Sequence, residues 1–470
     1  MITNLNLLPN PKALSGYDEN RNYAVRSFRP LIHTDKPDWK AAIGVFCGYA
    51  EKAHGLTFTE GKGGVELVFD YALDKGHYRI DTLSSDAVLL MASDYNGICY
   101  ALASLLQIMD GANVPALTVY DYPECSYRTL MVDLAREWHT FDQVLNFVDL
   151  CFLYKASYLH LHFIDSQSYT LPSDEFPNLP TKDRHYTKEQ IAELVAYAKE
   201  RGVTLIPEFE APGHATEMIR AYPELFGCTE GSGPEGGLVC AGKPGVYDSL
   251  DRIITEICAL FPDSPYIHIG GDEADIRRWN ECPDCRAFME KNGLDSVKAL
   301  YTEFVRIMTR IVLAHNRKPI VWEGFPKEGA EKISRDTIVI SWENLYHLTP
   351  DLLEEGFNVI NASWQPLYIV PEGHEEWTPY TILEWDLYTW RNWWYRSAAF
   401  LNPIHVQPTD QVIGAQLCAW ECTYEQEIQQ VKEKLAALLE RTWTIRRYLN
   451  NEQFRVRMEH LVGLADRILR

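Results

Sequence analysis

From Tyr127 onward, short apolar runs of strand length alternate with longer stretches in which apolar residues recur at helical spacing. Strands that alternate with helices form βαβ units, so this pattern predicts a parallel sheet, and its eight repeats predict a (β/α)8 barrel. The expected strands are Thr129–Asp133, Ser157–Asp165, Val203–Glu210, Tyr266–Glu273, Pro319–Gly324, Thr337–Glu343, Asn358–Trp364 and Val412–Trp420. The expected helices include Phe141–Tyr154, Thr187–Arg201, Val246–Leu260, Ser296–His315 and Gln426–Leu449.

The first 125 residues have a different pattern, in which short strand-like runs are followed by one apolar helical stretch. A turn signal at Asp121-Tyr122-Pro123 ends this part of the chain. We therefore expect a small α+β domain over residues 1–125 and a catalytic barrel over residues 126–470. Its expected elements are the strands Val65–Phe69, Tyr78–Asp81 and Val88–Ala92 and the helix Tyr95–Met109.

Charge and hydropathy narrow the possible partners. The formal net charge of -22 argues against nucleic acid or an anionic membrane as a partner. No run reaches the ~18 apolar residues of a membrane span, and the N-terminus has no signal-peptide pattern. We therefore expect a cytoplasmic protein.

The 11 cysteines are odd in number and scattered, which is typical of a reducing compartment. Cys282-Pro283-Asp284-Cys285 is a single CxxC motif, and a zinc ribbon requires a second pair that the chain lacks at that spacing. The sequence prediction is therefore no metal. Structural zinc completed by Cys228 or Cys240 is the alternative that the sequence leaves open.

The run Ile267-His268-Ile269-Gly270-Gly271-Asp272-Glu273 combines a buried strand, two glycines and two adjacent carboxylates. Glycine permits a tight bend, and two carboxylates at a strand end can hold different pKa values. Such a pair is typical of a glycoside hydrolase. The same residues also suit an acidic helix start, so the other strand ends must decide.

The carboxyl ends of barrel strands form the active site of this fold, and here they carry carboxylates and aromatic side chains. Aromatic residues make up 12% of the chain, with 13 Trp, and flat aromatic rings suit the C–H faces of sugars. A core-only interpretation would place aliphatic residues at most of these positions. The strand-end residues are Asp133, Arg136, His160, His162, Asp165, Glu208, Glu210, His214, Asp272, Glu273, Trp322, Trp342, Trp364, Tyr368, Trp420 and Glu421.

Four motifs together resemble the family 20 glycoside hydrolases, the β-N-acetylhexosaminidases. They are Met131-Val132-Asp133-Leu134-Ala135-Arg136, His160-Leu161-His162-Phe163-Ile164-Asp165, Pro207-Glu208-Phe209-Glu210-Ala211-Pro212-Gly213-His214 and His268-Ile269-Gly270-Gly271-Asp272-Glu273. The N-terminal unit is similar to the non-catalytic α+β domain that precedes the barrel in that family. The resemblance thus covers nearly the whole chain.

The resemblance implies an exo-acting, retaining enzyme that removes terminal β-linked GlcNAc or GalNAc from a small oligosaccharide or glycoconjugate. In it Glu273 is the general acid/base, and Asp272 orients the substrate's 2-acetamido group, whose oxygen is the nucleophile that forms an oxazolinium intermediate. The resemblance assigns sugar contacts to Arg136, Trp322, Trp342, Tyr368 and Trp420, and a relay to Asp165 and His214. No cofactor is implied, and the oligomeric state is not specified.

Three positions depart from the family pattern. Ser166 replaces a second Asp after the second strand, and Val370 replaces an Asp two residues after Tyr368. After the eighth strand, Cys422 replaces the usual Glu, while Glu421 directly follows Trp420 and is our candidate contact instead. These departures leave the choice between glucosaminide and galactosaminide open.

Three other functions compete with this interpretation. His160, His162, His214 and His268 suit a metal-dependent barrel hydrolase, although His160 and His162 are better interpreted as core residues. A sugar-binding, inactive relative would keep the tryptophans and lose the acid. A retaining glycosidase with a protein nucleophile would use Glu323 or Glu343 and would not need a 2-acetamido group.

Overall fold

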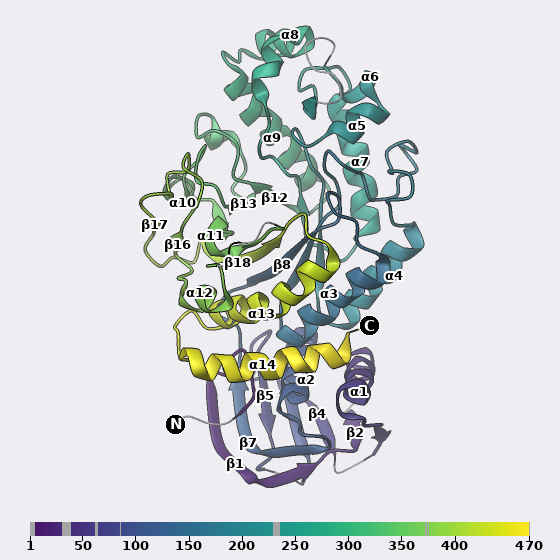
Figure 1. The fold of residues 1–470 in the computed structure, drawn as a ribbon. Helices are drawn as coiled ribbons and strands as arrows, with labels where there is room; N and C mark the ends of the chain where they lie inside the picture. Colours follow the sequence, from purple (N-terminus) through teal and green to yellow (C-terminus); the bar gives the residue numbers. More distant parts are fainter. Residues whose placement is uncertain are drawn as a thin grey trace.

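The protein consists of an open sheet at one end and a barrel at the other, as seen in Figure 1. The computed structural model describes residues 5–30, 39–61, 64–84, 86–228, 236–371, 374 and 376–469. The last helix, α14 (Asn451–Ile468), lies between the two units and contacts both α1 (Lys40–His54) of the first unit and α13 (Tyr424–Trp443) of the second. No helix among the described residues has both the length and the apolar character to cross a bilayer.

The N-terminal unit is the predicted α+β domain. In its described part, seven strands run in the order β1-β7-β5-β6-β4-β2-β3. The predicted strands occur as expected, and α2 ends at Ile108, one residue before its predicted end. The sequence pattern did not predict β1, β2, β3, β7 or α1. The elements are β1 (Ala13–Ala24), β2 (Ser27–Pro30), α1 (Lys40–His54), β3 (Thr59–Glu60), β4 (Val65–Phe69), β5 (Tyr78–Asp81), β6 (Val88–Ala92), α2 (Tyr95–Ile108) and β7 (Asn113–Asp121).

The second unit is a closed barrel of eight parallel strands within the described residues. β18 pairs with both β14 and β8, which closes the sheet and confirms the predicted (β/α)8 architecture. Each predicted run overlaps one of these strands, β8 and β12 begin slightly before their predicted starts, and several runs continue past the strand end into the loops of the site. The strands are β8 (Tyr127–Asp133), β9 (Tyr158–His162), β10 (Thr204–Glu208), β11 (Tyr266–His268), β12 (Lys318–Trp322), β13 (Ile338–Ser341), β14 (Asn358–Asn361) and β18 (Val412–Ala419).

The helices around the barrel confirm most of the sequence pattern, with one correction. The predicted helix Gln426–Leu449 ends early, because the chain leaves α13 after Trp443 and starts α14 at Asn451, with Asn450 and Gln453 forming a capping box. The helices are α3 (Phe141–Tyr154), α4 (Lys188–Glu200), α5 (Thr216–Ala221), α6 (Pro223–Phe226), α7 (Val246–Leu260), α8 (Pro283–Asn292), α9 (Val297–Ala314), α10 (Thr349–Glu354), α11 (Trp364–Leu367), α12 (Pro379–Glu384) and α13 (Tyr424–Trp443). Short 3-10 turns η2 (Ile276–Asn280) and η3 (Ala330–Lys332) and strands β15 (Tyr368–Ile369), β16 (Thr389–Trp390) and β17 (Ile404–His405) complete the loops.

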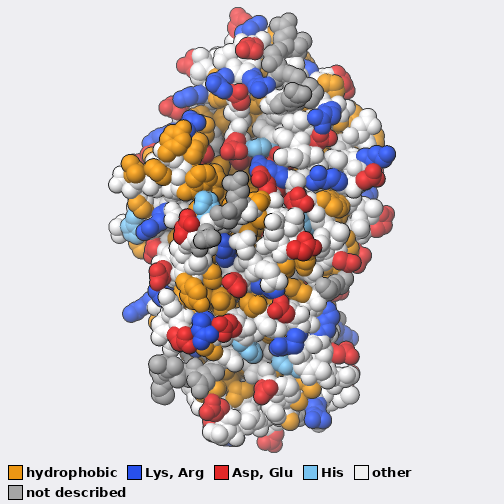
Figure 2. All heavy atoms as spheres, in the orientation of Figure 1, with side chains coloured by type: hydrophobic (Ala, Val, Ile, Leu, Met, Phe, Trp, Pro, Cys, Tyr) orange, Lys and Arg blue, Asp and Glu red, His pale blue; other side chains and the backbone are white. Residues whose placement is uncertain are grey.

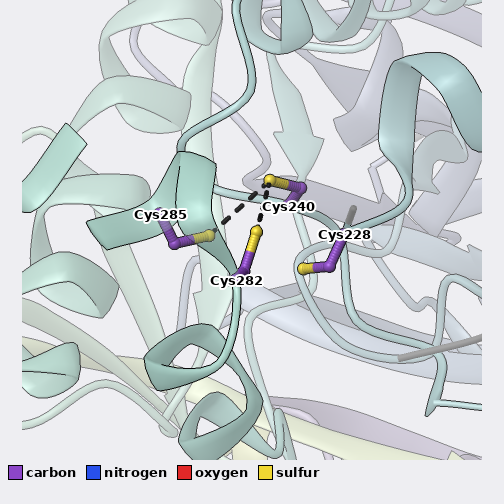
Figure 3. Close-up of side chains that lie close together, drawn as sticks. All are labelled: Cys228, Cys240, Cys282 and Cys285. Carbon is purple, nitrogen blue, oxygen red and sulfur yellow. Dashed lines mark hydrogen bonds between the residues drawn. The ribbon is translucent and has the colours of Figure 1, made fainter. Parts of the chain in front are cut away.

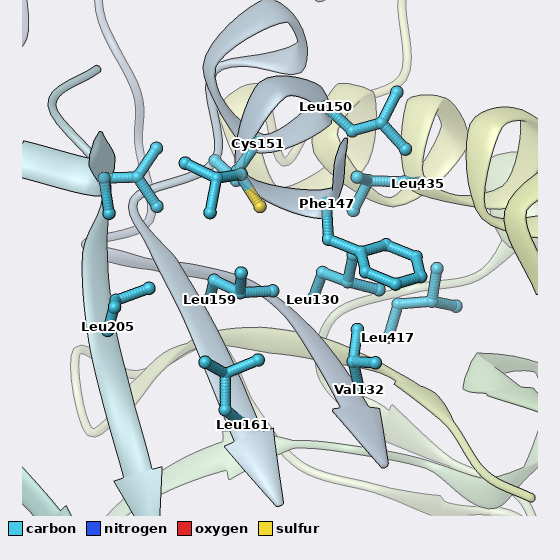
Figure 4. Close-up of a cluster of buried hydrophobic side chains, with 14 of the residues drawn as sticks. Leu130, Val132, Phe147, Leu150, Cys151, Leu159, Leu161, Leu205, Leu417 and Leu435 are labelled. Atoms are coloured by element: carbon cyan, nitrogen blue, oxygen red, sulfur yellow. The ribbon is translucent and has the colours of Figure 1, made fainter. Parts of the chain in front are cut away.

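Alternate residues along the barrel strands face either the surrounding helices or the barrel interior. Leu159 and Leu161 of β9 point outward against Phe147 of α3, in a layer that Figure 4 shows continuing over β8, β10 and β18. Burying each such leucine contributes about 1.5–3 kcal/mol. His160 and His162 alternate with these leucines and therefore face the barrel interior. The register places His162 beside Asp133 of β8 and Glu208 of β10, which forms one polar layer at the carboxyl ends of the strands.

Candidate active site

Asp272 and Glu273 lie on a tight turn at the end of β11. The strand stops at His268, before its predicted end at Glu273, because Gly270, Gly271 and Glu273 all have positive φ angles (68°, 96° and 46°). A Cβ atom on Gly270 would lie 2.0 Å from Glu210 Oε2, so the turn requires glycine there. The Asp272 side chain is buried, whereas that of Glu273 is 47% exposed. The turn thus presents a buried carboxyl group, that of Asp272, next to an accessible one, that of Glu273.

His214 links Glu273 to Asp165. His214 follows β10 in a turn with a φ of 50°, and its Nδ1 lies 3.3 Å from Asp165 Oδ1. Its Nε2 lies 3.5 Å from Glu273 Oε2. The structure therefore brings together the relay that the sequence analysis assigned to Asp165 and His214.

Arg136 is held in a fixed orientation between two carboxylates. Its Nε donates to Asp165 Oδ2 (2.8 Å), its Nη1 donates to Glu421 Oε1 (2.7 Å), and its guanidinium lies 4.9 Å from the centre of the Trp420 ring. Asp133 orders both turns by accepting the backbone N–H groups of Arg136 (2.9 Å) and Glu421 (3.2 Å). A charged fork beside an exposed carboxylate is suited to binding neighbouring hydroxyl groups.

Three histidines surround one carboxylate beneath the site. Glu208 lies 2.7 Å from His162 Nδ1, 3.0 Å from His160 Nε2 and 2.9 Å from His268 Nδ1. Burial opposes ionisation of Glu208, but these imidazoles hold its pKa well below the usual value. His214 lies elsewhere, between Asp165 and Glu273. The four histidines do not converge on one point, which favours the interpretation of His160 and His162 as core residues.

Aromatic side chains form the wall of the site. Trp322 and Trp342 have ring centres 6.2 Å apart, and Trp322 and Trp420 are 6.1 Å apart. Tyr368, on β15, stacks on Trp342 with an interplanar angle of 14°. Trp322 Nε1 donates to Glu208 Oε1 (2.6 Å), which fixes the indole above the polar layer. The four aromatic residues that were predicted to contact the sugar therefore lie together in one cluster.

The aromatic wall continues toward solvent in residues that were not predicted to contact the substrate. Trp364 begins α11 instead of ending β14, and its ring centre lies 5.3 Å from that of Trp342 and 5.2 Å from that of Trp393. Trp393, Tyr346 and Tyr395 are exposed. Figure 2 shows hydrophobic side chains gathered on the surface around α10, β16 and β17. Trp393 and Tyr395 could not be assigned from sequence because they lie in a long loop before β18.

Burial and neighbouring charges set the proton distribution. Burial and the charge of Glu273 raise the pKa of Asp272 to about 6, although His214 opposes this. The contact with His214 lowers the pKa of Glu273, and Asp165 raises that of His214 well above its usual value despite burial. In the free site the shared proton thus favours Asp272. A ligand that excludes water from Glu273 would raise its pKa, and one that donates an N–H to Asp272 would lower the pKa of Asp272.

Glu210, Glu323 and Glu343 are the other buried carboxyl groups at these strand ends. Glu210 accepts the backbone N–H of Gly271 (3.0 Å), and burial raises its pKa, so it supports the turn. Glu323 accepts four backbone N–H groups, those of residues 344–347, at 2.7–3.2 Å. Burial raises the pKa of Glu343 to about 8. The sequence alone could not distinguish the roles of these three carboxyl groups, because the roles depend on which loops contact each of them.

Comparison with known proteins decides the family. Residues 125–446 match the catalytic domain of glycosyl hydrolase family 20. The chain belongs to this family. Among its relatives, the β-hexosaminidase of Vibrio furnissii is 30% identical over 341 residues, which are 66% of this chain and 55% of the relative. The β-hexosaminidase of Akkermansia muciniphila is 31% identical over 279 residues, or 53% of this chain and 56% of the relative. The matched region is thus about half the length of these curated relatives.

Solved structures of family 20 members share the fold of this chain. The exo β-N-acetylglucosaminidase from Vibrio harveyi, solved in complex with N-acetylglucosamine, superposes with a TM-score of 0.80 at 23% identity, covering 98% of this chain and 77% of that one. The β-N-acetylhexosaminidase from Streptomyces coelicolor has a TM-score of 0.75 at 20% identity, covering 98% and 96%. The similarity extends over both units of the fold.

Proposed function

We propose that this family 20 member is an exo-acting, retaining β-N-acetylhexosaminidase that removes terminal β-linked GlcNAc or GalNAc by substrate-assisted catalysis. One observation carries the proposal: Asp272 Oδ1 is buried and has no hydrogen-bond partner among the described residues. A buried carboxylate oxygen without a donor is costly, and the N–H of a 2-acetamido group supplies the missing hydrogen bond. The names of the Vibrio furnissii and Vibrio harveyi proteins support the same activity.

In the proposed reaction, the acetamido oxygen attacks the anomeric carbon while Glu273 protonates the leaving oxygen. The bond to the aglycone breaks, and ionised Asp272 balances the positive oxazolinium ion. Glu273 then takes a proton from a water molecule as its oxygen attacks the anomeric carbon. This attack opens the oxazolinium ring, and the anomeric configuration is retained overall. Arg136 and Glu421 hold sugar hydroxyl groups, and Trp342 and Tyr368 enclose the acetamido group. The intramolecular nucleophile has a high effective concentration because the site holds it in place.

The alternative mechanism with a protein nucleophile has weak geometric support. The Glu323 carboxylate is occupied by four backbone N–H groups and is not free to attack a sugar. Glu343 is largely protonated at neutral pH, because burial raises its pKa to about 8. A protonated carboxyl group is a poor nucleophile. The inactive sugar-binding alternative would require loss of the acid, and Glu273 is present beside His214.

We further propose a cytoplasmic location and a small oligosaccharide or glycoconjugate as substrate. All 11 cysteines are free of disulfides, which supports a reducing compartment. Two residues after Tyr368, Val370 replaces the Asp that contacts the sugar in the family pattern. Because that contact is missing, both GlcNAc and GalNAc remain possible as the terminal sugar. Cell fractionation tests the location, and recovery of the protein mainly from a secreted fraction would contradict it.

The test of activity is release of 4-nitrophenol from the β-N-acetylglucosaminide, the β-N-acetylgalactosaminide and the β-glucoside. Wild type and Glu273→Gln are compared with and without EDTA. We expect cleavage of the acetamido sugars only, unaffected by EDTA and lost in the variant. Cleavage of the plain glucoside would favour a protein nucleophile, and no cleavage of any substrate would favour a binding role. Loss of activity in EDTA with an unchanged melting temperature would favour a metal mechanism, whereas removal of a structural ion would also lower the melting temperature.

A further inference from the structure

Four cysteines from separate parts of the barrel loops converge beside the candidate active site. Cys228 follows α6, Cys240 precedes α7, and Cys282 and Cys285 lie at the start of α8. Their sulfur atoms all lie within 4.8 Å of one another, and Figure 3 shows the four side chains directed toward a common point. Cys240 Sγ lies 3.6 Å from the sulfurs of both Cys282 and Cys285.

We propose that this four-cysteine cluster binds one structural Zn²⁺ ion. Four thiolates at ~2.3 Å from a tetrahedral zinc ion are separated from one another by ~3.8 Å, close to the 3.6 Å spacing of Cys240 from its two neighbours. A disulfide would instead require about 2.05 Å between two of the sulfurs, and all four cysteines are free. The sequence predicted no metal, with zinc completed by Cys228 or Cys240 as the open alternative, because the spacing alone does not show that both of these cysteines meet Cys282 and Cys285.

Burial and ligand type indicate a structural ion. Cys240, Cys282 and Cys285 are buried and Cys228 is half-buried, so solvent reaches the cluster poorly. Four sulfur ligands fill a tetrahedral zinc ion and leave no position for water or substrate. Sulfur donors also select zinc over magnesium or calcium, which prefer oxygen.

The cluster joins the two loops that carry the candidate catalytic groups. Cys240 follows Val239, whose backbone N–H donates to Pro212 O (2.9 Å), two residues before His214. Cys282 and Cys285 follow Glu273 in the next loop, where Trp279 Nε1 donates to Val239 O (2.9 Å). A bound ion would therefore link the His214 loop covalently to the Glu273 loop and would help to keep the two side chains facing each other.

The experiment measures metal in the unmodified chain, so its outcome is independent of glycosidase activity. Protein without an affinity tag, expressed with zinc and passed through a chelating column, is analysed by mass spectrometry for zinc and iron. We expect about one zinc per chain. The Cys282→Ser/Cys285→Ser variant should lose at least about nine-tenths of it. Cys258→Ser, on α7 and outside the cluster, is the matched control and should keep its zinc.

A second measurement covers the case in which the double variant does not fold. Wild type is titrated with an organomercurial, and zinc release is followed with a colorimetric chelator. We expect zinc to appear as the cluster thiols react, and cobalt-substituted protein to show the visible bands of tetrahedral thiolate coordination. Wild type that lacks zinc, carries iron in its place, forms disulfides between these cysteines, or retains zinc in the double variant would overturn the proposal.

Discussion

His214 Nε2 faces Glu273 Oε2 across 3.5 Å, while the opposite ring nitrogen of His214 faces Asp165. One imidazole thus connects the accessible carboxyl group of the site to a buried carboxylate. Asp165 raises the pKa of His214 well above its usual value despite burial, which favours the positively charged ring. This charge lowers the pKa of Glu273 and opposes the burial that raises the pKa of Asp272. In the proposed reaction, proton supply to the leaving group is therefore set by the coupled trio of Asp272, Glu273 and His214.

The coupled trio predicts a pH profile. The pair of carboxyl groups must hold one proton to act as an acid, and the pKa of Asp272, raised by burial, is about 6. We expect kcat/KM to fall as pH rises through this value, by about tenfold per pH unit at the limit. His214→Asn removes the positive neighbour, so the pKa of both carboxyl groups rises and the descending limb moves to higher pH. A limb that stays in place or moves to lower pH would contradict the coupling.

Substitution of Asp272 tests the role of its ionised form. Asp272→Asn removes the negative charge that balances the oxazolinium ion, and we expect kcat to fall about 10²–10³-fold with an unchanged melting temperature. Asp275→Asn, on the same loop and paired with exposed arginines, is the control and should retain activity. Near-normal turnover of Asp272→Asn would mean that the acetamido group is not the nucleophile.

Glu421 occupies a position one residue before the acidic residue of the family pattern, yet it contacts Arg136 at 2.7 Å. Loss of a charged hydrogen-bond partner costs about 1.5–3 kcal/mol when the pair is buried, and less here because Glu421 is half-exposed. We expect Glu421→Gln to raise KM several-fold, with a smaller change in kcat. Glu425→Gln, an exposed residue of α13, should leave both constants unchanged. Equal kinetics for the two variants would show that Glu421 does not bind sugar.

Gly270 allows the catalytic turn to pass close to Glu210. Gly270→Ala combines a positive φ of 68° with a Cβ atom that would overlap the Glu210 carboxylate. Gly55→Ala has nearly the same φ, 67°, but open space around its Cβ. We expect both to lose about 1 kcal/mol from backbone strain, and only Gly270→Ala to lose activity. Equal activity in both variants would mean that Glu210 does not constrain the turn.

The sequence predicted the barrel well because its strands are buried on both faces. Leu159 and Leu161 face α3 while His160 and His162 face the interior, so the run appears strongly strand-like in sequence. β1 was missed because its residues are mostly exposed and polar, and the strand is defined by its pairing with β7. The end of α13 was misplaced because apolar spacing continues past Trp443.

The site was predictable where local motifs carry it, and not where distant loops complete it. Asp272, Glu273, Arg136 and His214 come from strand ends with distinctive sequences. The contacts of Trp393 and the occupied carboxylate of Glu323 depend on loops whose paths no local pattern specifies. The cysteine cluster likewise requires Cys228 and Cys240 to meet Cys282 and Cys285 across more than one loop.

The central claim is that the substrate's acetamido oxygen is the nucleophile, and a series of fluorinated substrates tests it most directly. The 4-nitrophenyl β-glucosaminides with acetyl, monofluoroacetyl, difluoroacetyl and trifluoroacetyl groups differ mainly in how strongly that oxygen can attack. We predict that kcat/KM falls steeply with each fluorine, by about a thousandfold over the series, which corresponds to about 4 kcal/mol. A change of less than about tenfold over the whole series would contradict substrate-assisted catalysis.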